Sequence, residues 1–459
     1  MRLGGSIMSH SSNNLGNEGH LLSPMEIFLP TSTSDPPPAD DDPADTTASF
    51  FHHDEDPPRR QRIVDRKMLL RVSLGLGIIA FLGLWIIPQG ATIMAPPARL
   101  SFVPTTTTES TTTTSTITIM QLADIHLGEA PNTFWGPEQD AKTWRALDSY
   151  IQHHLSSTTT TTSSSSLPGS IQLLVLSGDQ ITANDFTTRN ATEYYLALGH
   201  RLAKYQIPFC FIFGNHDDKP NDHTQANYTN RQELMRVMQR HFRHWSLARP
   251  GPSHVTGVSN YWLNVYDNDD TNNMAARLLF LDTGGGQLAQ QIDESHLSWM
   301  MESNQEHPNV PVVAFAHIPT NEFQYTSSDD NNNDNGNTEA CVGENNEGGI
   351  APLQDYDAGL VDTLARIMPT VAVLAVGHNH GNDYCCTYPS ASLHLCFGRH
   401  SGYGGYGSWD RGARMYQLSM SVSDDNTDQE KSSFSWKSWV LMESGETQDH
   451  YGPFFVDWI

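Results

Sequence analysis

The sequence predicts an α/β fold, and two observations lead to this prediction. Apolar runs of strand length alternate with segments of helical periodicity, and the runs are as continuously apolar as strands buried on both faces. Most runs also end directly in a polar turn that contains glycine, aspartate or histidine. Because open α/β sheets carry their sites at the carboxyl ends of strands, we expect one site along this edge. The expected strands are 116–123, 171–176, 209–213, 278–281, 310–316 and 371–376, and the expected helices are 144–155, 192–205, 231–245 and 356–368.

The stretch 209–218, FCFIFGNHDD, shows this arrangement most clearly. Gly214 permits a sharp turn after the apolar strand and exposes Asn215, His216 and Asp217 at its end. An amide oxygen can ligate a divalent cation, an imidazole can protonate a substrate, and a carboxylate can orient that imidazole. An ordinary polar turn would also explain a single motif of this kind, but the motif recurs.

Similar turns follow four other predicted strands. The DIH sequence at 124–126 places two side chains on the same side of an extended segment, where they can share one metal. The SGD sequence at 177–179 presents a carboxylate whose two oxygens can bridge two cations. Together the turns offer oxygen and imidazole donors, which suit two cations such as Fe, Mn or Zn better than a thiolate zinc site. The candidate side chains at the ends of these strands are Asp124, His126, Asp179, Asn215, His216, His317, His378 and His380.

In chain order these motifs read DxH, GD, GNHD, H and GHxH. This order resembles the calcineurin-like metallophosphoesterase family from Thr116 to about Leu441. The sequences GHNHGNDYC, LCFG and AHIP look like its eukaryotic, purple acid phosphatase-like branch of membrane or secreted proteins. The resemblance implies the metallophosphoesterase fold, a four-layer α/β/β/α sandwich with two mixed sheets inside and helices outside.

The resemblance also implies a role for each motif residue. His216 would act as the acid on the leaving oxygen, with Asp217 orienting it. The implied mechanism is in-line attack on phosphorus by a metal-bound hydroxide at a dinuclear site of divalent or mixed-valence Fe, Mn or Zn. Asp124, His126 and His380 would hold the first metal, and Asn215, His317 and His378 would hold the second. Asp179 would bridge the two metals.

Two positions differ from the purple enzymes. Purple enzymes have a tyrosine three residues after the GD aspartate, where this chain has Thr182, and they lack the histidine of the DxH motif. We therefore expect a colourless enzyme. In the loop 398–409, Arg399 and His400 are candidate phosphate contacts at the substrate entrance, and a plain surface turn is the alternative.

The composition changes outside the expected catalytic domain, 116–445. Residues 1–66 are rich in Ser, Pro and Asp and predict a disordered cytosolic tail. Residues 67–88 hold an apolar run after clustered Arg and Lys, which is typical of a transmembrane signal anchor; a buried helix and a cleavable signal peptide are the alternatives. The Thr/Ser-rich stretch 89–115 is interpreted as a stalk, and 446–459 as a C-terminal segment.

We expect a single-pass type II membrane protein whose catalytic domain is lumenal or extracellular, because the basic residues precede the apolar run. Sequons at Asn190 and Asn227 would suit N-glycosylation on that side.

Cysteine placement points to the same side of the membrane. Cys385, Cys386 and Cys396 lie close in sequence, and a pair such as Cys385 with Cys396 could form a disulfide in an oxidising compartment. Cys341 is another candidate partner.

The formal net charge of -26 argues against a nucleic-acid partner, because no basic surplus is available to neutralise phosphates. A metal pair would still attract a small anion through its local positive charge. We therefore expect a phosphorylated substrate, either a small molecule or a protein, and a phosphomonoesterase. A phosphodiesterase acting on nucleotide or lipid-headgroup esters is the alternative. A non-catalytic anchored glycoprotein is least favoured, because the ligand set is complete.

Overall fold

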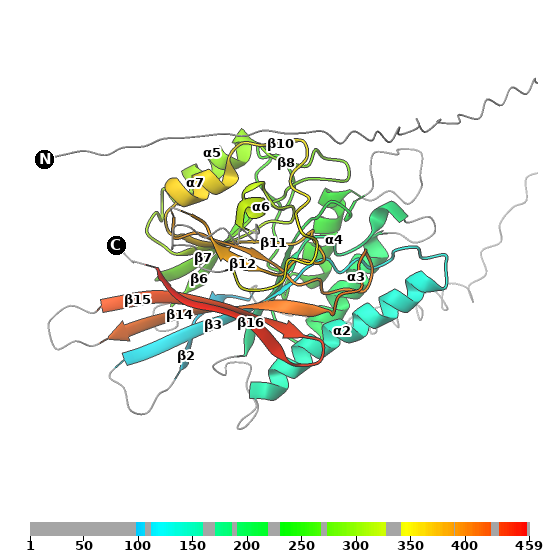
Figure 1. The fold of residues 1–459 in the computed structure, drawn as a ribbon, viewed down its shortest axis with the longest axis horizontal. Helices are drawn as coiled ribbons and strands as arrows, with labels where there is room; N and C mark the ends of the chain where they lie inside the picture. Colours follow the sequence, from blue (N-terminus) through cyan, green and yellow to red (C-terminus); the bar gives the residue numbers. More distant parts are fainter. Residues whose placement is uncertain are drawn as a thin grey trace, which may run out of the picture. The chain divides into compact units, whose positions relative to one another are not determined.

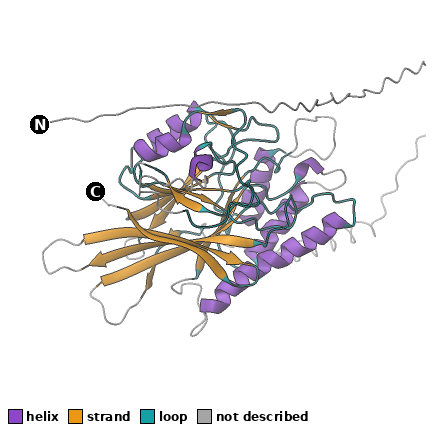
Figure 2. Cartoon of the chain, viewed as in Figure 1, coloured by secondary structure: helices purple, strands orange, loops and turns teal. Residues whose placement is uncertain are grey.

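The centre of the fold is a pair of large mixed β-sheets (Figures 1 and 2). The predicted α/β class with two mixed sheets is therefore confirmed. The computed structural model describes residues 98–105, 112–158, 170–185, 191–218, 230–267, 273–326, 341–389, 391–423 and 431–456.

The first sheet, sheet A, has the strand order β1-β6-β7-β9-β11-β13-β12. Its inner strands β7, β9, β11 and β13 run parallel to their neighbours within this group, whereas β6 is antiparallel to β7 and β12 is antiparallel to β13. The short edge strand β1 runs parallel to β6. The carboxyl ends of the four parallel strands therefore share one edge. The strands are β1 (Leu100–Ser101), β6 (Tyr261–Tyr266), β7 (Met274–Phe280), β9 (Val312–Phe315), β11 (Val371–Val376), β12 (Cys385–Thr387) and β13 (His394–Phe397).

The second sheet, sheet B, has the order β16-β15-β14-β3-β4-β5, with β2 also paired to β3. Strands β3, β4 and β5 are parallel, and β14, β15 and β16 extend the sheet in antiparallel fashion. The strands are β2 (Val103–Thr105), β3 (Thr112–Leu122), β4 (Ile171–Ser177), β5 (Phe209–Ile212), β14 (Gly412–Ser423), β15 (Lys431–Met442) and β16 (Thr447–Val456).

Side chains of sheet A alternate between two apolar layers. Leu278 and Phe280 of β7 belong to a core shared with sheet B, whereas Leu279 belongs to a core shared with α5, α6 and α7. Helices α2, α3 and α4 contribute to the first core from the sheet B side (Figure 1). The helices are α2 (Trp135–Thr158), α3 (Ala191–Ala203), α4 (Arg231–Phe242), α5 (Glu294–Asn304), α6 (Glu322–Thr326) and α7 (Leu360–Arg366).

Aromatic rings join the facing sides of the two sheets. Phe315 of β9 stacks on Phe280 of β7, with ring centroids 5.3 Å apart, and its other side meets the edge of Tyr416 of β14 at 6.0 Å. All three rings are fully buried. Sheet A thus packs directly on sheet B through large apolar side chains, each contributing roughly 2–3 kcal/mol of burial free energy.

Arg231, the first residue of α4, is a buried link between the two sheets. Its guanidinium donates to Asp218, which follows β5 in sheet B, at 2.9 Å, and to Asp282, which follows β7 in sheet A, at 2.5 Å. Its Nη2 group is also hydrogen-bonded, so the buried charge is both paired and stabilised by further acceptors. Three carbonyl oxygens accept from it, those of Gly214, Gly284 and Gly285.

The structure corrects the expected stalk at 89–115. Strand β3 begins at Thr112, four residues before the expected start, and Thr112–Ser115 pair with the end of β14. Strands β1 and β2 also lie within this range. Threonine is β-branched and suits a strand as well as a stalk, so the composition alone did not separate the two.

Other boundaries also differ from the prediction. Helix α2 begins at Trp135 rather than at residue 144, and α7 begins at Leu360, because Tyr356–Asp357 form the short strand β10 beside β8 (Gln291–Ile292). Strand β16 lies within the C-terminal segment 446–459 and pairs with β15.

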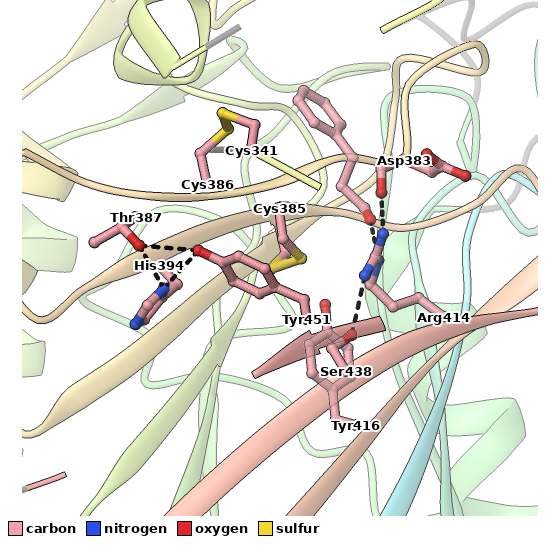
Figure 3. Close-up of a disulfide and its surroundings, with 12 residues drawn as sticks. Cys341, Asp383, Cys385, Cys386, Thr387, His394, Arg414, Tyr416, Ser438 and Tyr451 are labelled. Atoms are coloured by element: carbon pink, nitrogen blue, oxygen red, sulfur yellow. Dashed lines mark hydrogen bonds between the residues drawn. A yellow bond between two sulfur atoms is a disulfide. The ribbon is translucent and has the colours of Figure 1, made fainter. Parts of the chain in front are cut away.

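Two disulfides join residues around β12 (Figure 3). Successive side chains of a strand point to opposite faces. Cys385 pairs with Cys396, directly opposite on β13, and Cys386 pairs with Cys341 on the other face.

Several expectations concern residues that the structure does not describe. The apolar run at 67–88 and the sequons at Asn190 and Asn227 lie outside the described residues. Within the described ranges, no helix combines the length and apolar character needed to cross a membrane.

We predict that Arg231→Met lowers the free energy of unfolding by about 3–5 kcal/mol, because Asp218 and Asp282 would stay buried without their cation. Urea unfolding followed by tryptophan fluorescence measures the loss. Arg236, exposed on the same helix, provides the matched control: Arg236→Met should change stability by less than about 0.5 kcal/mol. Equal stability of the two variants would contradict the link between the sheets.

We also predict unequal contributions from the disulfides. Cys341 and Cys386 are 45 residues apart and Cys385 and Cys396 are 11 apart. Loss of loop-closure entropy in the unfolded chain therefore predicts about 4 kcal/mol for the first bond and about 3 kcal/mol for the second. Paired cysteine-to-alanine variants, unfolded in urea without reductant, test this order. A larger loss for the shorter loop would refute it.

Candidate metal centre

The candidate ligands lie at the adjoining carboxyl ends of five strands. Sheet B supplies residues that follow β3, β4 and β5, and sheet A supplies residues that follow β9 and β11. Four of the seven non-glycine residues with positive φ in the described chain are among these ligands. Such backbone conformations cost on the order of 1–3 kcal/mol each and are typical of functional sites. The four are Asp124 (φ 55°), His126 (φ 49°), Asp179 (φ 51°) and His378 (φ 73°).

A first group of donors consists of Asp124, His126 and His380, whose ligand atoms all lie within 4.8 Å of one another. The Nε2 atoms of the two histidines are 3.1 Å apart, and Asp124 Oδ1 is 3.8 Å from His380 Nε2. Tyr406 O lies 3.0 Å from His380 Nδ1. Because that carbonyl can only accept, Nδ1 of His380 carries the hydrogen and Nε2 presents a lone pair in the neutral ring.

A second group consists of Asp179, His317 and His378, with Asn215 among them. His317 Nδ1 donates to the carbonyl of Ser177 at 2.9 Å, so its Nε2 faces Asp179 Oδ2 at 3.1 Å and Asn215 Oδ1 at 3.0 Å. Asn215 Oδ1 also lies 3.0 Å from His378 Nδ1. Oxygen and nitrogen acceptors therefore converge on one point.

Asp179 lies between the two groups. Its Oδ2 is 3.1 Å from His317 Nε2 and 3.6 Å from His126 Nε2, and its Oδ1 accepts from the His216 amide at 2.7 Å. Gly178 adopts a φ of 102°, which glycine tolerates without strain and which turns the chain here. Any other residue would also clash, because its Cβ would lie 2.2 Å from the His317 ring.

Burial and charge set the protonation of these groups. Burial raises the pKa of Asp124 to about 7 and lowers the pKa values of His378 and His380 to about 3. Burial also disfavours charge on His317, but Asp179 outweighs it and raises the pKa of His317 to about 9. In the metal-free chain, the first group is thus poor in positive charge, and the second holds a single His317–Asp179 ion pair.

The donor chemistry fits two cations. In the first group, imidazole lone pairs and a carboxylate face one another, and in the second the Asn215 oxygen and the His378 ring lie beside the His317–Asp179 ion pair. A cation in each group would take the place of protons among these acceptors. Nδ1 of His380 and of His317 is held by a backbone carbonyl, as is common for metal-ligating histidines. All donors are oxygen or nitrogen, which suits Fe, Mn or Zn.

A cavity of about 270 Å³ opens onto both groups. His216 lines it, and its Nδ1 lies 2.9 Å from Oδ1 of Asn184, so Nε2 is the ring nitrogen left for a substrate. The cavity is also bounded by His126, Asp179, His378, His380 and Tyr406.

The structure corrects the expected role of Asp217. Its carboxylate does not contact His216; it accepts from the backbone amides of Gln180 at 2.9 Å and Gly214 at 2.7 Å. The Tyr195 hydroxyl lies 3.0 Å from it. Asp217 therefore ties together the turns after β4 and β5, and Asn184 holds the imidazole instead.

The expected phosphate contacts Arg399 and His400 are also corrected. Arg399 is 4% exposed and donates to Asp383 at 2.6 Å and to the carbonyl of Asp410 at 2.8 Å. His400 is fully buried, with its ring centroid 4.0 Å from that of His380. Neither lines the cavity, because Arg399 is committed to Asp383 and Asp410, and His400 packs against the ring of His380.

Three residues beside the site were not predicted as contacts. Thr182 Oγ1 lies 3.0 Å from His126 Nδ1, Asn184 holds His216, and Tyr406 stacks on His380 with ring centroids 4.1 Å apart. Thr182 stands where purple enzymes have tyrosine, a position that the resemblance had marked. Tyr406 lies in the loop 398–409 that the sequence analysis placed at the substrate entrance, but its contact with His380 was not expected, and nothing in the local sequence marked Asn184.

The chain is similar to several known proteins. The chain is 27% identical over 338 residues to Phosphatase DCR2 of Saccharomyces cerevisiae, covering 67% of this chain and 52% of the yeast protein. It therefore spans about half the length of that relative. It is 26% identical over 354 residues to a protein of Arabidopsis thaliana named "Probable inactive purple acid phosphatase 28", covering 70% of this chain and 80% of that protein.

A solved structure and a family model also match. A dimetal phosphatase from Danio rerio, 12% identical, aligns with a TM-score of 0.38 over 73% of this chain and 99% of its own. Residues 117–382 match the family described as calcineurin-like phosphoesterase. Because this match covers more than half of the 459 residues, the protein belongs to the calcineurin-like phosphoesterase family.

Proposed function

We propose that this protein is a phosphomonoesterase that uses two metal ions. The observation that carries the proposal is the convergence of seven oxygen and imidazole donors on two adjacent points, with Asp179 between them and His216 beside them. Family membership supports hydrolysis of a phosphoric ester.

Asp124, His126 and His380 would hold one cation, Asn215, His317 and His378 the other, and Asp179 would bridge them. When bound, the two cations would neutralise charge on the phosphate and lower the pKa of a water molecule. Five of these donors are buried, and Asn215 and His378 are held by contacts with His317 and Asp124, so the donors need little reorganisation to bind.

His216 would assist departure of the alcohol. In the imidazolium form both ring nitrogens donate: Nδ1 to Asn184, and Nε2 to the leaving oxygen of the substrate. The amide of His216 is held by Asp179, so the same carboxylate that serves the metals also sets the position of this acid. The substrate's phosphate would lie in the cavity between His216 and the two metal groups.

A non-catalytic role is the competing possibility, since one relative is named as a probable inactive phosphatase. The complete donor set and the free Nε2 of His216 favour catalysis. A chain that kept the fold but had lost its activity would have no need to retain four strained ligands.

We further propose that the catalytic region lies on the lumenal or extracellular side of a secretory membrane, anchored by the run 67–88. The two disulfides support this location, because disulfides persist in oxidising compartments. Protease protection of the full chain in sealed microsomes tests it, and cleavage of the catalytic region from the cytosolic side would refute it.

Hydrolysis of p-nitrophenyl phosphate, compared with bis-p-nitrophenyl phosphate, tests the activity. We predict that His216→Ala lowers kcat by about 10²–10⁴-fold, since it removes the acid. Asn184→Ala should cost less, since it only frees the ring. His254→Ala, at an exposed position, is the control. Faster turnover of the diester would identify a phosphodiesterase, and an inactive metal-loaded wild type would refute catalysis.

We predict about two metal ions per wild-type chain, and fewer than one in Asp179→Ala, because that variant loses the shared carboxylate. Mass spectrometry of metals in the purified protein, after reconstitution with Mn, Fe or Zn, measures both. Two retained ions in Asp179→Ala would show that this carboxylate is dispensable for binding.

A further inference from the structure

A segment outside the family motifs, 341–351, lies along the loop that carries His378 and His380. Val342 exchanges two backbone hydrogen bonds with Cys385, at 2.8 and 3.0 Å. Further along, the amide of Asn346 donates to the carbonyl of Gly381 at 3.1 Å. The Cys341–Cys386 disulfide fixes the start of the segment. The segment 341–351 thus supports the metal-ligand loop along its length.

Glu347 is the side chain through which this segment reaches the residues on both sides of His380. Its Oε2 accepts from Asn379 Nδ2 at 2.7 Å, and its Oε1 accepts from the amide of Gly381 at 2.7 Å. Packing at this point is close, because a Cβ on Gly381 would lie 2.9 Å from Cγ of Glu347. One carboxylate thereby fixes both neighbours of a candidate metal ligand.

The same carboxylate also fixes Tyr406. The Tyr406 hydroxyl donates to Glu347 Oε1 at 2.8 Å and lies 3.2 Å from the amide of His380, which donates to it. The Tyr406 ring stacks on the His380 ring at an interplanar angle of 12°, and its carbonyl accepts from His380 Nδ1. His380 is therefore held by its ring face, its amide and its Nδ1.

We propose that Glu347 is a positioning residue for the first metal group, and that through Asn379, Gly381 and Tyr406 it presents Nε2 of His380 to Asp124 and His126. The inference rests on the proposed function, because it concerns the same metal site. Glu347 itself touches none of the reacting atoms. Its effect passes through the orientation of His380, so it should act on one of the two metals more than on the other.

Charge and position can be separated at this residue. Glu347→Asp keeps the negative charge but withdraws the carboxylate by one methylene, which breaks the contacts to Asn379 and Gly381. Glu347→Gln removes the charge and the acceptor for Asn379, but it keeps the length and the oxygen that Gly381 and Tyr406 share. A positioning role therefore predicts that Asp is the more harmful substitution, whereas a role of charge alone predicts that Gln is.

The experiment removes metals from the full chain with a chelator and then measures the binding of Mn²⁺ alone by isothermal titration calorimetry. We expect the Kd of one of the two ions to rise about 10–100-fold in Glu347→Asp and less in Glu347→Gln, with the other ion little affected. Glu344→Gln is the matched control, because this acid lies on the same segment with a half-exposed side chain and its carboxylate makes no contact with His380. It should bind Mn²⁺ like the wild type.

Tyr406→Phe provides a second variant that keeps the stacked ring but removes the hydroxyl. It should weaken the same ion in the same direction, and the melting temperature of the metal-free chain reports whether each variant still folds. Wild-type affinity in Glu347→Asp, or a greater loss in Glu347→Gln than in Glu347→Asp, would overturn the inference. Absence of Mn²⁺ binding to the wild type would instead overturn the proposed function together with it.

Discussion

The site depends on how the edges of the two sheets are held together. Arg231 bridges them with buried ion pairs to Asp218, after β5, and Asp282, after β7. Each donor group mixes residues from both sheets, so neither group exists within one sheet. The first combines Asp124 and His126 from sheet B with a histidine from sheet A. A shift of one edge against the other by the length of a single side chain would separate the donors.

The strands can deliver ligands so close together because the turns after them adopt costly backbone conformations. Positive φ at Asp124, His126, Asp179 and His378 turns the chain sharply, and each such residue opposes folding by roughly 1–3 kcal/mol. The apolar layers on both faces of sheet A, and between the sheets, offset this cost. Bound cations would offset more of it, since they would bind the folded arrangement of donors and not the unfolded chain.

The orientation of three histidine ligands is set by residues that contact the ligands rather than the metals. Carbonyl oxygens of Ser177 and Tyr406 hold Nδ1 of His317 and His380, and Thr182 lies at Nδ1 of His126. These contacts decide which nitrogen faces the cations, and such outer contacts commonly tune metal affinity as strongly as a change of ligand geometry. The segment 341–351 makes further contacts of this kind, because it supports the loop that carries His378 and His380.

The sequence by itself determined the α/β class, the five strands whose carboxyl ends carry the candidate donors, and the seven donors themselves, because each motif is local: an apolar run followed at once by a polar turn. Only the tertiary structure decided which side chains support those donors. Asn184 rather than Asp217 holds His216, and the contact spans 32 positions along the chain. Arg399 is committed to Asp383, and Glu347 reaches Gly381 from 34 positions away. Such partners are chosen by packing between distant segments, and neither residue type nor spacing encodes that packing locally.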